Sequence, residues 1–223
     1  MHLSEKKSQP SAAGLTGLVL AGGLSRRMGA GVEKALLPLA GRPLLRHVLE
    51  RLSPQVDRLV ISANGDPARF LPFALPVVAD LRNQWLGPLA GVEAAFARTD
   101  AEWLLSVAVD LPFLPTDLAE KMQEPLHTLA EPLPVVAASG GRSHFVVALW
   151  PRTALPSLTT ALENGQFSLY DWFQRHPHRQ VHFAAVGDAP DPFFNINRPA
   201  DLQEAAVWCQ PPTANPAGPI GSP

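Results

Sequence analysis

Residues 17–29 read GLVLAGGLSRRMG, and Lys34 follows a few positions later. The apolar start predicts a strand, and the small residues that end it predict a tight turn. Gly22 and Gly23 let the backbone approach a ligand without a Cβ in the way, so that N–H groups can face phosphate oxygens or base edges. Arg27 can grip a terminal phosphate with two hydrogen bonds, and Lys34 can neutralise the neighbouring phosphates. The combination predicts binding of a nucleoside triphosphate.

Two commoner phosphate-binding motifs do not fit this stretch. A Walker A loop ends in Gly-Lys followed by Ser or Thr, whereas Lys34 follows Glu33 and precedes Ala35. A dinucleotide fingerprint needs three glycines; Gly29 and Gly31 supply two, but Lys34 occupies the place of the third.

Composition limits the classes of protein that this chain can represent. With 223 residues, of which 46% are hydrophobic, it is long enough for one substantial domain. We expect that domain at residues 15–209, between polar or proline-rich tails at residues 1–14 and 210–223. The formal charge of −2 gives no reason to expect nucleic acid or an anionic membrane as a partner. A single cysteine and the absence of a signal-peptide core favour the cytoplasm.

Short apolar runs alternate with amphipathic ones, which predicts an α/β fold with a mostly parallel sheet and helices on both faces. The first half reads as strands at 18–21, 59–63, 77–79 and 104–109 and helices at 43–53, 89–98 and 118–123. The second half predicts strands at 134–139 and 144–150 joined by a hairpin or a bulged connection, helices near 153–163 and 168–175, a strand at 180–185 and a helix at 199–208.

Polar residues follow the predicted strands at one edge of the sheet. Ligands of open α/β sheets bind beyond the carboxyl ends of the strands, so the glycine turn after Leu20, Asn64, Asp80 and Asp110 would meet there. A carboxylate such as that of Asp110 suits Mg²⁺, which prefers oxygen ligands and keeps waters and substrate phosphates as the others. Asp110 and Asn64 would also suit ordinary turns.

Two further segments carry a resemblance to a known family. The motif LAGGLSRRMG with its following lysine is similar to the signature of sugar-nucleotide-type nucleotidyltransferases. Leu86–Gly91 (LGPLAG) and Phe193–Pro199 (FFNINRP) resemble segments of molybdenum cofactor guanylyltransferases, in the same order, so that the likeness covers roughly residues 16–208. The chain departs from that family at Glu33, where the family has aspartate, in a slightly longer loop before Lys34, and at Phe145, where the family has proline.

The resemblance implies a Rossmann-like nucleotidyltransferase fold in three layers and transfer of GMP from Mg-GTP to the terminal phosphate of molybdopterin, with release of pyrophosphate. It implies catalytic roles for Arg27, Lys34 and Asp110, with Asp110 as the metal ligand, and no general base. The implied binding residues for nucleotide or cofactor are Leu20, Ala21, Gly22, Gly23, Lys34, Asn64, Asp80, Asp110, Asn195 and Asn197.

Asn195 and Asn197 belong to the molybdopterin side in this resemblance. Strand spacing would point both side chains to one face, although asparagines before Pro199 could equally cap the last helix. His144 is left out of the site, because a single histidine opening a strand is more often structural.

Two alternatives stay open at this point. A cytidylyltransferase acting on the same cofactor or on a small alcohol phosphate would share the glycine turn, Lys34 and Asp110, but should lack the Leu86–Gly91 and Phe193–Pro199 segments. An inactive relative that binds nucleotide or cofactor as an adaptor would explain Glu33 and the longer loop. Molybdenum-insertion proteins and molybdoenzyme chaperones are further candidate partners.

Overall fold

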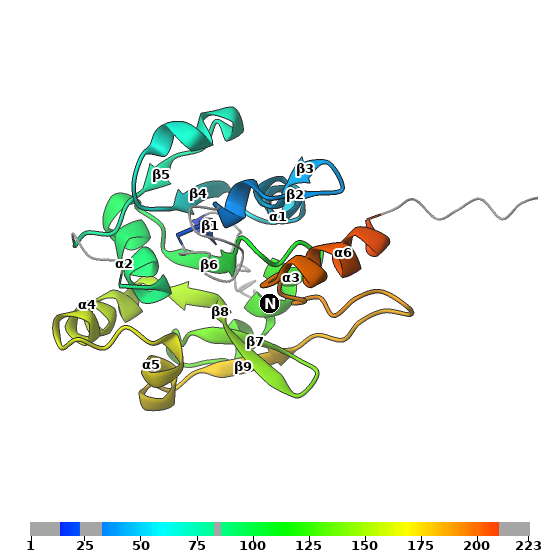
Figure 1. Ribbon diagram of the computed structural model, residues 1–223. Coiled ribbons are helices and arrows are strands. Elements are labelled where there is room, and N and C mark those ends of the chain that lie inside the picture. The colour runs from blue at the N-terminus through cyan, green and yellow to red at the C-terminus, as the bar shows by residue number, and fades with distance from the viewer. Residues whose placement is uncertain (1–13, 23–32, 83–85, 210–223) are drawn as a thin grey trace, which may run out of the picture.

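The alternation of apolar and amphipathic runs produces a seven-stranded sheet in the computed structural model, which describes residues 14–22, 33–82 and 86–209. The strand order is β5-β4-β1-β6-β8-β7-β9, which Figure 1 shows as a stack from top to bottom. The strands are β1 (Leu15–Leu20), β4 (Arg58–Ser62), β5 (Val77–Val78), β6 (Trp103–Ala108), β7 (Val135–Ser139), β8 (Arg142–Pro151) and β9 (Arg179–His182).

The sheet is mostly parallel, as predicted. Strand β1 pairs in parallel with β4 and β6, and β4 pairs in parallel with β5. Strand β8 runs antiparallel to both β6 and β7, while β9 is parallel to β7. The predicted hairpin is therefore present, and it also contains a bulge, because the β7–β8 register shifts between Val136 and Ala137. The predicted strand at 180–185 ends early, at His182.

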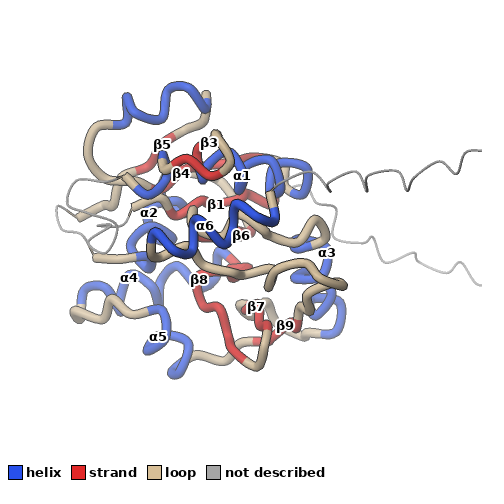
Figure 2. The backbone as a smooth tube through the Cα atoms, turned by 45° about the vertical axis from the view of Figure 1, so that its right-hand side comes forward, coloured by secondary structure: helices blue, strands red, loops and turns tan. Residues whose placement is uncertain are grey.

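Helices cover both faces of the sheet and complete the three predicted layers (Figures 1 and 2). One core cluster contains the apolar faces of α1 (Leu44–Leu52) and α3 (Leu118–Gln123). The other contains those of α2 (Pro88–Arg98), α4 (Leu155–Glu163) and α5 (Leu169–Arg175). Helix α1 begins one residue later than predicted, because Pro43 takes the N-cap position.

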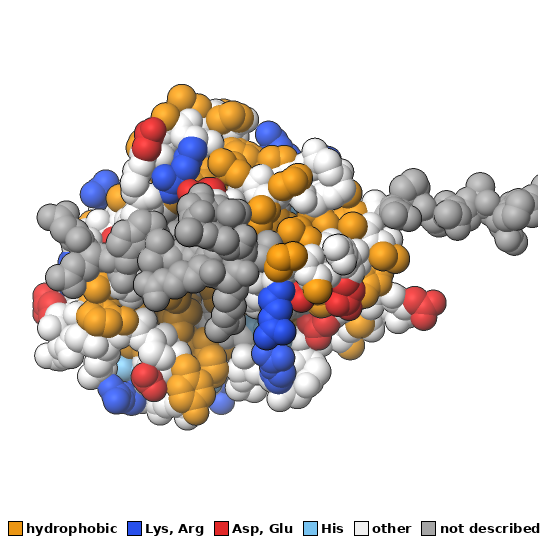
Figure 3. Space-filling view, viewed as in Figure 1, with side chains coloured by type: hydrophobic (Ala, Val, Ile, Leu, Met, Phe, Trp, Pro, Cys, Tyr) orange, Lys and Arg blue, Asp and Glu red, His pale blue; other side chains and the backbone are white. Residues whose placement is uncertain are grey.

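A small accessory layer was not expected from the sequence. Strands β2 (Pro38–Leu39) and β3 (Arg42–Pro43) form a two-stranded antiparallel sheet, and α6 (Pro199–Trp208) packs beside it over a separate apolar cluster that includes Leu39, Leu44, Ile196 and Ala205. Hydrophobic side chains also gather on the surface around these elements (Figure 3). Through this cluster, the C-terminal part of the described chain packs next to the short 3₁₀ helix Lys34–Leu36 and the residues that follow it.

The predicted tails, apart from Gly14, lie outside the described residues. Within the described ranges, no helix combines the length and apolar character that crossing a membrane requires.

Candidate active site

The carboxyl ends of β1, β4, β5 and β6 share one edge of the sheet, because these strands are parallel. Ala21 N donates to Ser62 O at 2.9 Å, and Val109 N donates to Leu20 O at 3.2 Å. These bonds hold the end of β1 between the ends of β4 and β6. Leu20 and Ala21 are buried while Gly22 is exposed, so the chain reaches the surface at the predicted glycine turn. The predicted site residues Gly23 and Arg27 lie outside the described residues.

Lys34 lies at the centre of a cluster that joins distant parts of the sequence. It begins the short 3₁₀ helix Lys34–Leu36, and its Nζ forms an ion pair with the Asp110 carboxylate. The same Nζ donates to Asn197 Oδ1 at 2.9 Å. The side chains of Lys34 and Asp110 are 15% and 13% exposed, so the pair is mostly shielded from water yet still reachable. We call Lys34, Asp110 and Asn197 the lysine cluster.

Asp110 has the character expected of a cation ligand. Its Oδ1 is buried and has no hydrogen-bond partner among the described residues. Leaving a buried acceptor unpaired costs about 1–3 kcal/mol, and a divalent cation would satisfy it. In the described ranges, His, Cys, Asp and Glu side chains form no group of three or more that could hold a metal.

The segment that carries Asn195 and Asn197 is not a strand, so the predicted strand spacing is wrong. Asn195 is exposed and Asn197 is half-buried against Lys34. Ile196 N donates to Asp110 O at 3.0 Å, which fixes this segment across the end of β6. Neither asparagine caps α6, because Arg198 holds the N-cap position, and Asp201 in the first turn accepts hydrogen bonds from the backbone N–H groups of Asn197 and Arg198 at 2.7 and 2.8 Å.

Asn64 and Asp80 form a second cluster at the same edge. Asn64 Nδ2 donates to Asp80 Oδ2 at 2.7 Å, and Asp80 N donates to Asn64 Oδ1 at 2.9 Å. Burial raises the pKa of Asp80 above its usual value, and nearby Glu93 raises it further, while hydrogen bonds from Asn64 and from the backbone of Leu86 lower it. We call Asn64 and Asp80 the amide cluster. Of the predicted residues that follow these strands, Asn64 and Asp80 thus belong to the amide cluster and Asp110 belongs to the lysine cluster.

Comparison with known proteins agrees with this geometry. Residues 17–181 match a family model described as a MobA-like NTP transferase domain. A molybdenum cofactor guanylyltransferase of Rhodopseudomonas palustris is 47% identical over 194 residues, which is 84% of this chain and 90% of the relative. One from Mesorhizobium japonicum is 44% identical over 90% of this chain and 98% of its own length. The chain belongs to the molybdenum cofactor guanylyltransferase family.

Solved structures show the same fold. A molybdopterin-guanine dinucleotide biosynthesis protein A from Archaeoglobus fulgidus superposes with a TM-score of 0.69 at 24% identity, covering 87% of this chain and 98% of that one. A Mycobacterium tuberculosis protein, solved as a complex with manganese, superposes with a TM-score of 0.61 at 18% identity, covering 86% and 98%. The predicted family, the nucleotidyltransferase class of enzyme and the α/β fold are thus confirmed.

The Leu86–Gly91 segment, which resembles the guanylyltransferase family, has a packing role in this structure. Gly91 lies in the first half of α2, and a Cβ there would stand 2.6 Å from Ser62 Oγ and 2.7 Å from Leu20 Cδ2. Only glycine lets α2 approach the ends of β1 and β4 this closely. Beside it, buried Glu93 of α2 forms an ion pair with Arg82, which follows the Asp80 strand end. The segment also contacts the amide cluster directly, through a hydrogen bond from the backbone of Leu86 to the Asp80 carboxylate.

Several residues near this edge were not predicted as site residues. Arg69, Glu33, Arg82 and Glu93 form ion pairs around the two clusters, and Asp191 bonds to Ser139. Periodicity gives no signal for such pairs, because their members come from different elements.

His144, which the sequence analysis leaves out of the site, packs against neighbouring side chains. Its Nε2 lies 2.8 Å from Ser139 Oγ, and its ring centroid lies 4.8 Å from that of Phe193. Burial lowers the pKa of His144 below its usual value, while Asp191 acts in the opposite direction.

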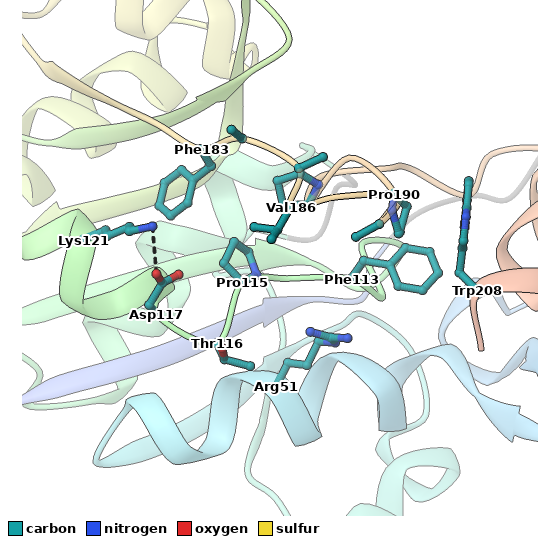
Figure 4. Close-up of a pocket in the computed structure, with 14 residues that line it drawn as sticks. Arg51, Phe113, Pro115, Thr116, Asp117, Lys121, Phe183, Val186, Pro190 and Trp208 are labelled. Carbon is teal, nitrogen blue, oxygen red and sulfur yellow. Dashed lines mark ion pairs between the residues drawn. The ribbon is translucent and has the colours of Figure 1, made fainter. Parts of the chain in front are cut away.

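A pocket of about 450 Å³ lies between the 183–192 loop and the segment after Asp110 (Figure 4). Phe113, Phe183 and Trp208 contribute aromatic walls. Its two cations are already engaged: Arg51 Nη1 donates to Leu114 O at 3.0 Å, and Lys121 forms an ion pair with Asp117. None of the predicted site residues that the structure describes lines it.

Proposed function

We propose that this chain transfers GMP from GTP to the terminal phosphate of molybdopterin, or of its molybdenum-loaded form, and releases pyrophosphate. The observation that carries the proposal is the lysine cluster at the strand ends, where the ammonium of Lys34 is shielded beside a carboxylate oxygen that has no partner among the described residues. The names and high coverage of the guanylyltransferase relatives support guanine and molybdopterin as the substrates.

The reaction needs charge and position more than acid–base chemistry. A phosphate oxygen of the acceptor attacks the α-phosphorus of GTP, a new P–O bond forms, and the bond to the β-phosphate oxygen breaks. The attacking oxygen is already anionic, so no general base is required. Lys34 neutralises charge that grows on the departing pyrophosphate, and we propose the same role for Arg27 on the terminal phosphate. Both acts lower the barrier because the positive charge is in place before the reaction begins.

We propose Mg²⁺ as the cation and Asp110 as its protein ligand. The buried Oδ1, which has no hydrogen-bond partner among the described residues, fits a hard cation that takes its other ligands from substrate phosphates and water. When bound, such a cation adds positive charge at the polyphosphate. Because Lys34 already pairs with Asp110, we expect the nucleotide phosphates to draw its ammonium away as the cation binds.

The amide cluster is the part we assign to the nucleotide's base or ribose, together with the turn at Leu20, Ala21, Gly22 and Gly23. An amide and a carboxylate held in one orientation can pair with the edge of guanine, and they reject a base that leaves them unmatched. We assign Asn195 to the molybdopterin side and Asn197 to the boundary between acceptor and nucleotide, since its Oδ1 contacts Lys34.

Other predictions accompany this function. We propose that residues 15–209 form the single catalytic domain, that the enzyme acts in the cytoplasm, and that molybdenum-insertion proteins and molybdoenzyme chaperones are its protein partners. The central sheet and all three apolar clusters arise from residues within 15–209.

A thermal-shift comparison of GTP, CTP, ATP and UTP, each with Mg²⁺, tests the nucleotide. A ligand present at a hundred times its dissociation constant stabilises a protein by about 2.7 kcal/mol, so GTP should raise Tm most. Equal or larger shifts with CTP would favour a cytidylyltransferase. Pyrophosphate release from GTP in the presence of molybdopterin tests the chemistry, and binding without release would favour an adaptor.

A further inference from the structure

The side chain of Glu33 pairs with an arginine from a distant part of the sequence. It directly precedes Lys34 and holds the N-cap position of the Lys34–Leu36 turn, yet its side chain makes no capping hydrogen bond. Its Oε2 lies instead 3.1 Å from Arg69 Nε. The N–H of that nitrogen does not point straight at the oxygen, so the contact is an ion pair rather than an aligned hydrogen bond.

Arg69 comes from a different element and makes a second contact. It lies in the short 3₁₀ helix Pro67–Phe73, which Asp66 caps by accepting a hydrogen bond from Ala68 N at 2.9 Å. Its Nη2 donates to Asn64 O at 2.5 Å, and its guanidinium carbon lies 4.9 Å from the ring centroid of Phe70. The ion-paired side chains are 24% and 30% exposed for Arg69 and Glu33, so solvent screens them only in part.

Gly65 makes room for this arrangement. Its φ of +87° lies in the region that favours glycine, and a Cβ at this position would stand 3.0 Å from Arg69 Nη1. The turn after β4 therefore accommodates the guanidinium beside the carbonyl of Asn64. A lysine would not reproduce this arrangement, because its single ammonium lacks the planar fork that reaches two acceptors at once.

One guanidinium thus connects the two clusters of the candidate site. On one side it holds Glu33, whose neighbour in the chain is Lys34 of the lysine cluster. On the other side it holds Asn64 of the amide cluster. A nucleoside triphosphate must reach both clusters at once, so the distance between them decides how well its base and its phosphates fit together.

We propose that Arg69 is a positioning residue, which sets the spacing between the phosphate-binding and base-binding halves of the nucleotide site by holding Glu33 and Asn64 together. The inference rests on the proposed function in that both clusters serve one nucleotide.

The test compares a ligand that spans both clusters with ligands that occupy only one. R69A should weaken binding of Mg-GTP by about tenfold in titration calorimetry. Guanosine alone and Mg-pyrophosphate alone should each bind within about twofold of the unchanged protein, because each needs only one cluster. E33Q, which removes the charge and keeps the shape, should weaken Mg-GTP by about threefold, and R69K should fall between R69A and the unchanged chain.

A surface arginine serves as the matched control. Arg58 also forms an ion pair, with Nη1 2.7 Å from Asp100 Oδ1, but it lies at the other end of β4 and is 68% exposed. R58A should therefore leave all three affinities unchanged. In steady-state assays R69A should raise KM for GTP more than it lowers kcat, since Lys34 and Asp110 still face the reacting phosphates.

Either of two results would overturn the positioning role: a folded R69A variant with unchanged Mg-GTP affinity, or fragments that weaken as much as Mg-GTP does. Failure of the proposed function gives a different pattern. If the unchanged chain prefers CTP, the guanine assignment fails, and the same comparison with Mg-CTP and cytidine tests Arg69. If no nucleoside triphosphate binds, both proposals are wrong.

Discussion

The lysine cluster and the amide cluster lie at the same edge of one sheet and differ in how their members are held. In the lysine cluster an ammonium contacts a carboxylate and an amide oxygen that come from residues 34, 110 and 197. In the amide cluster the neutral side chain of Asn64 makes two hydrogen bonds to Asp80, only 16 positions away: one of 2.7 Å to its carboxylate and one of 2.9 Å from its backbone N–H. The lysine cluster is held mainly by the attraction between opposite charges, and the amide cluster by hydrogen bonds with a fixed direction.

This difference corresponds to the two parts of a nucleotide. Charge pairs are tolerant of geometry, so Lys34 can exchange Asp110 for a phosphate without a large rearrangement. A pair of directed hydrogen bonds discriminates instead between surfaces that match and those that do not. We therefore expect damage to the lysine cluster to affect rate, and damage to the amide cluster to affect the choice of base.

The largest effect should follow from Asp110→Asn. The amide is a poor ligand for a hard cation, and Lys34 loses its carboxylate partner. We expect kcat for pyrophosphate release to fall on the order of a hundredfold or more at saturating Mg²⁺. Binding of GTP without metal should change little by calorimetry. Near-normal turnover would make Asp110 an ordinary turn residue.

The next largest effect should be a loss of GTP affinity in Asn197→Ala that Asn195→Ala does not share. Asn197→Ala removes the 2.9 Å hydrogen bond to Lys34, so GTP affinity should fall by about three- to tenfold together with GMP transfer. Asn195 is exposed and has no such contact, so Asn195→Ala should keep GTP affinity within about twofold while weakening molybdopterin. Calorimetry with each ligand measures both. Equal effects of the two variants on GTP would contradict the assignment of Asn197 to Lys34.

Much of the fold was predictable because periodicity reflects burial. The runs at β1, β4 and β6 are apolar on both faces and bounded by turn residues, as the centre of a parallel sheet requires. The two-residue strands β2 and β3 were missed, because two residues carry no periodicity. The strand predicted to reach 185 stops at His182, and its last bond to β7 is the one that Phe183 N donates to Ala138 O at 2.8 Å.

The candidate site was predictable residue by residue only in part. Asp80 and Asp110 follow apolar runs, so their positions at one edge follow from the parallel sheet. The contact between Lys34 and Asn197 spans 163 positions and depends on how α6 packs beside β2, which no local pattern encodes. The Arg69–Glu33 pair was missed for the same reason, because each member alone resembles a solvated surface charge.

A smaller effect should follow from Asn64→Ala, which breaks the amide cluster and leaves the lysine cluster intact. The Asp80 carboxylate loses the hydrogen bond from Asn64 that orients it and lowers its pKa, and the Asp80 backbone N–H loses its acceptor. The preference for GTP over CTP should fall by about three- to fivefold, while kcat with saturating GTP stays within about twofold. Thermal shifts with both nucleotides and a steady-state assay measure these outcomes. A large loss of kcat with unchanged nucleotide preference would reverse the roles of the two clusters.

The smallest effect concerns His144, which lies outside both clusters. A change at this residue should alter the pH dependence of protein stability without altering nucleotide binding. Burial lowers the pKa of His144 in the folded protein, so as the pH falls below about 6.5 the unfolded state takes up the proton first. The free energy of unfolding should therefore decline from that pH downward until the folded protein is protonated too. Asp191, which faces the ring, reduces the decline, and Arg142 increases it.

His144→Gln removes this titration and can still hydrogen-bond Ser139 Oγ, which lies 2.8 Å from His144 Nε2. Between about pH 7 and pH 5, the Tm of the unchanged protein should fall by about 1–2 °C more than that of the variant, since the ring is only half-buried. Thermal denaturation across this range measures the difference, and GTP affinity at about pH 7.5 serves as the control. Affinity should be the same in both proteins, because His144 contacts Ser139 and Phe193 rather than either cluster. A variant with the same pH profile but weaker GTP binding would place His144 in the site after all.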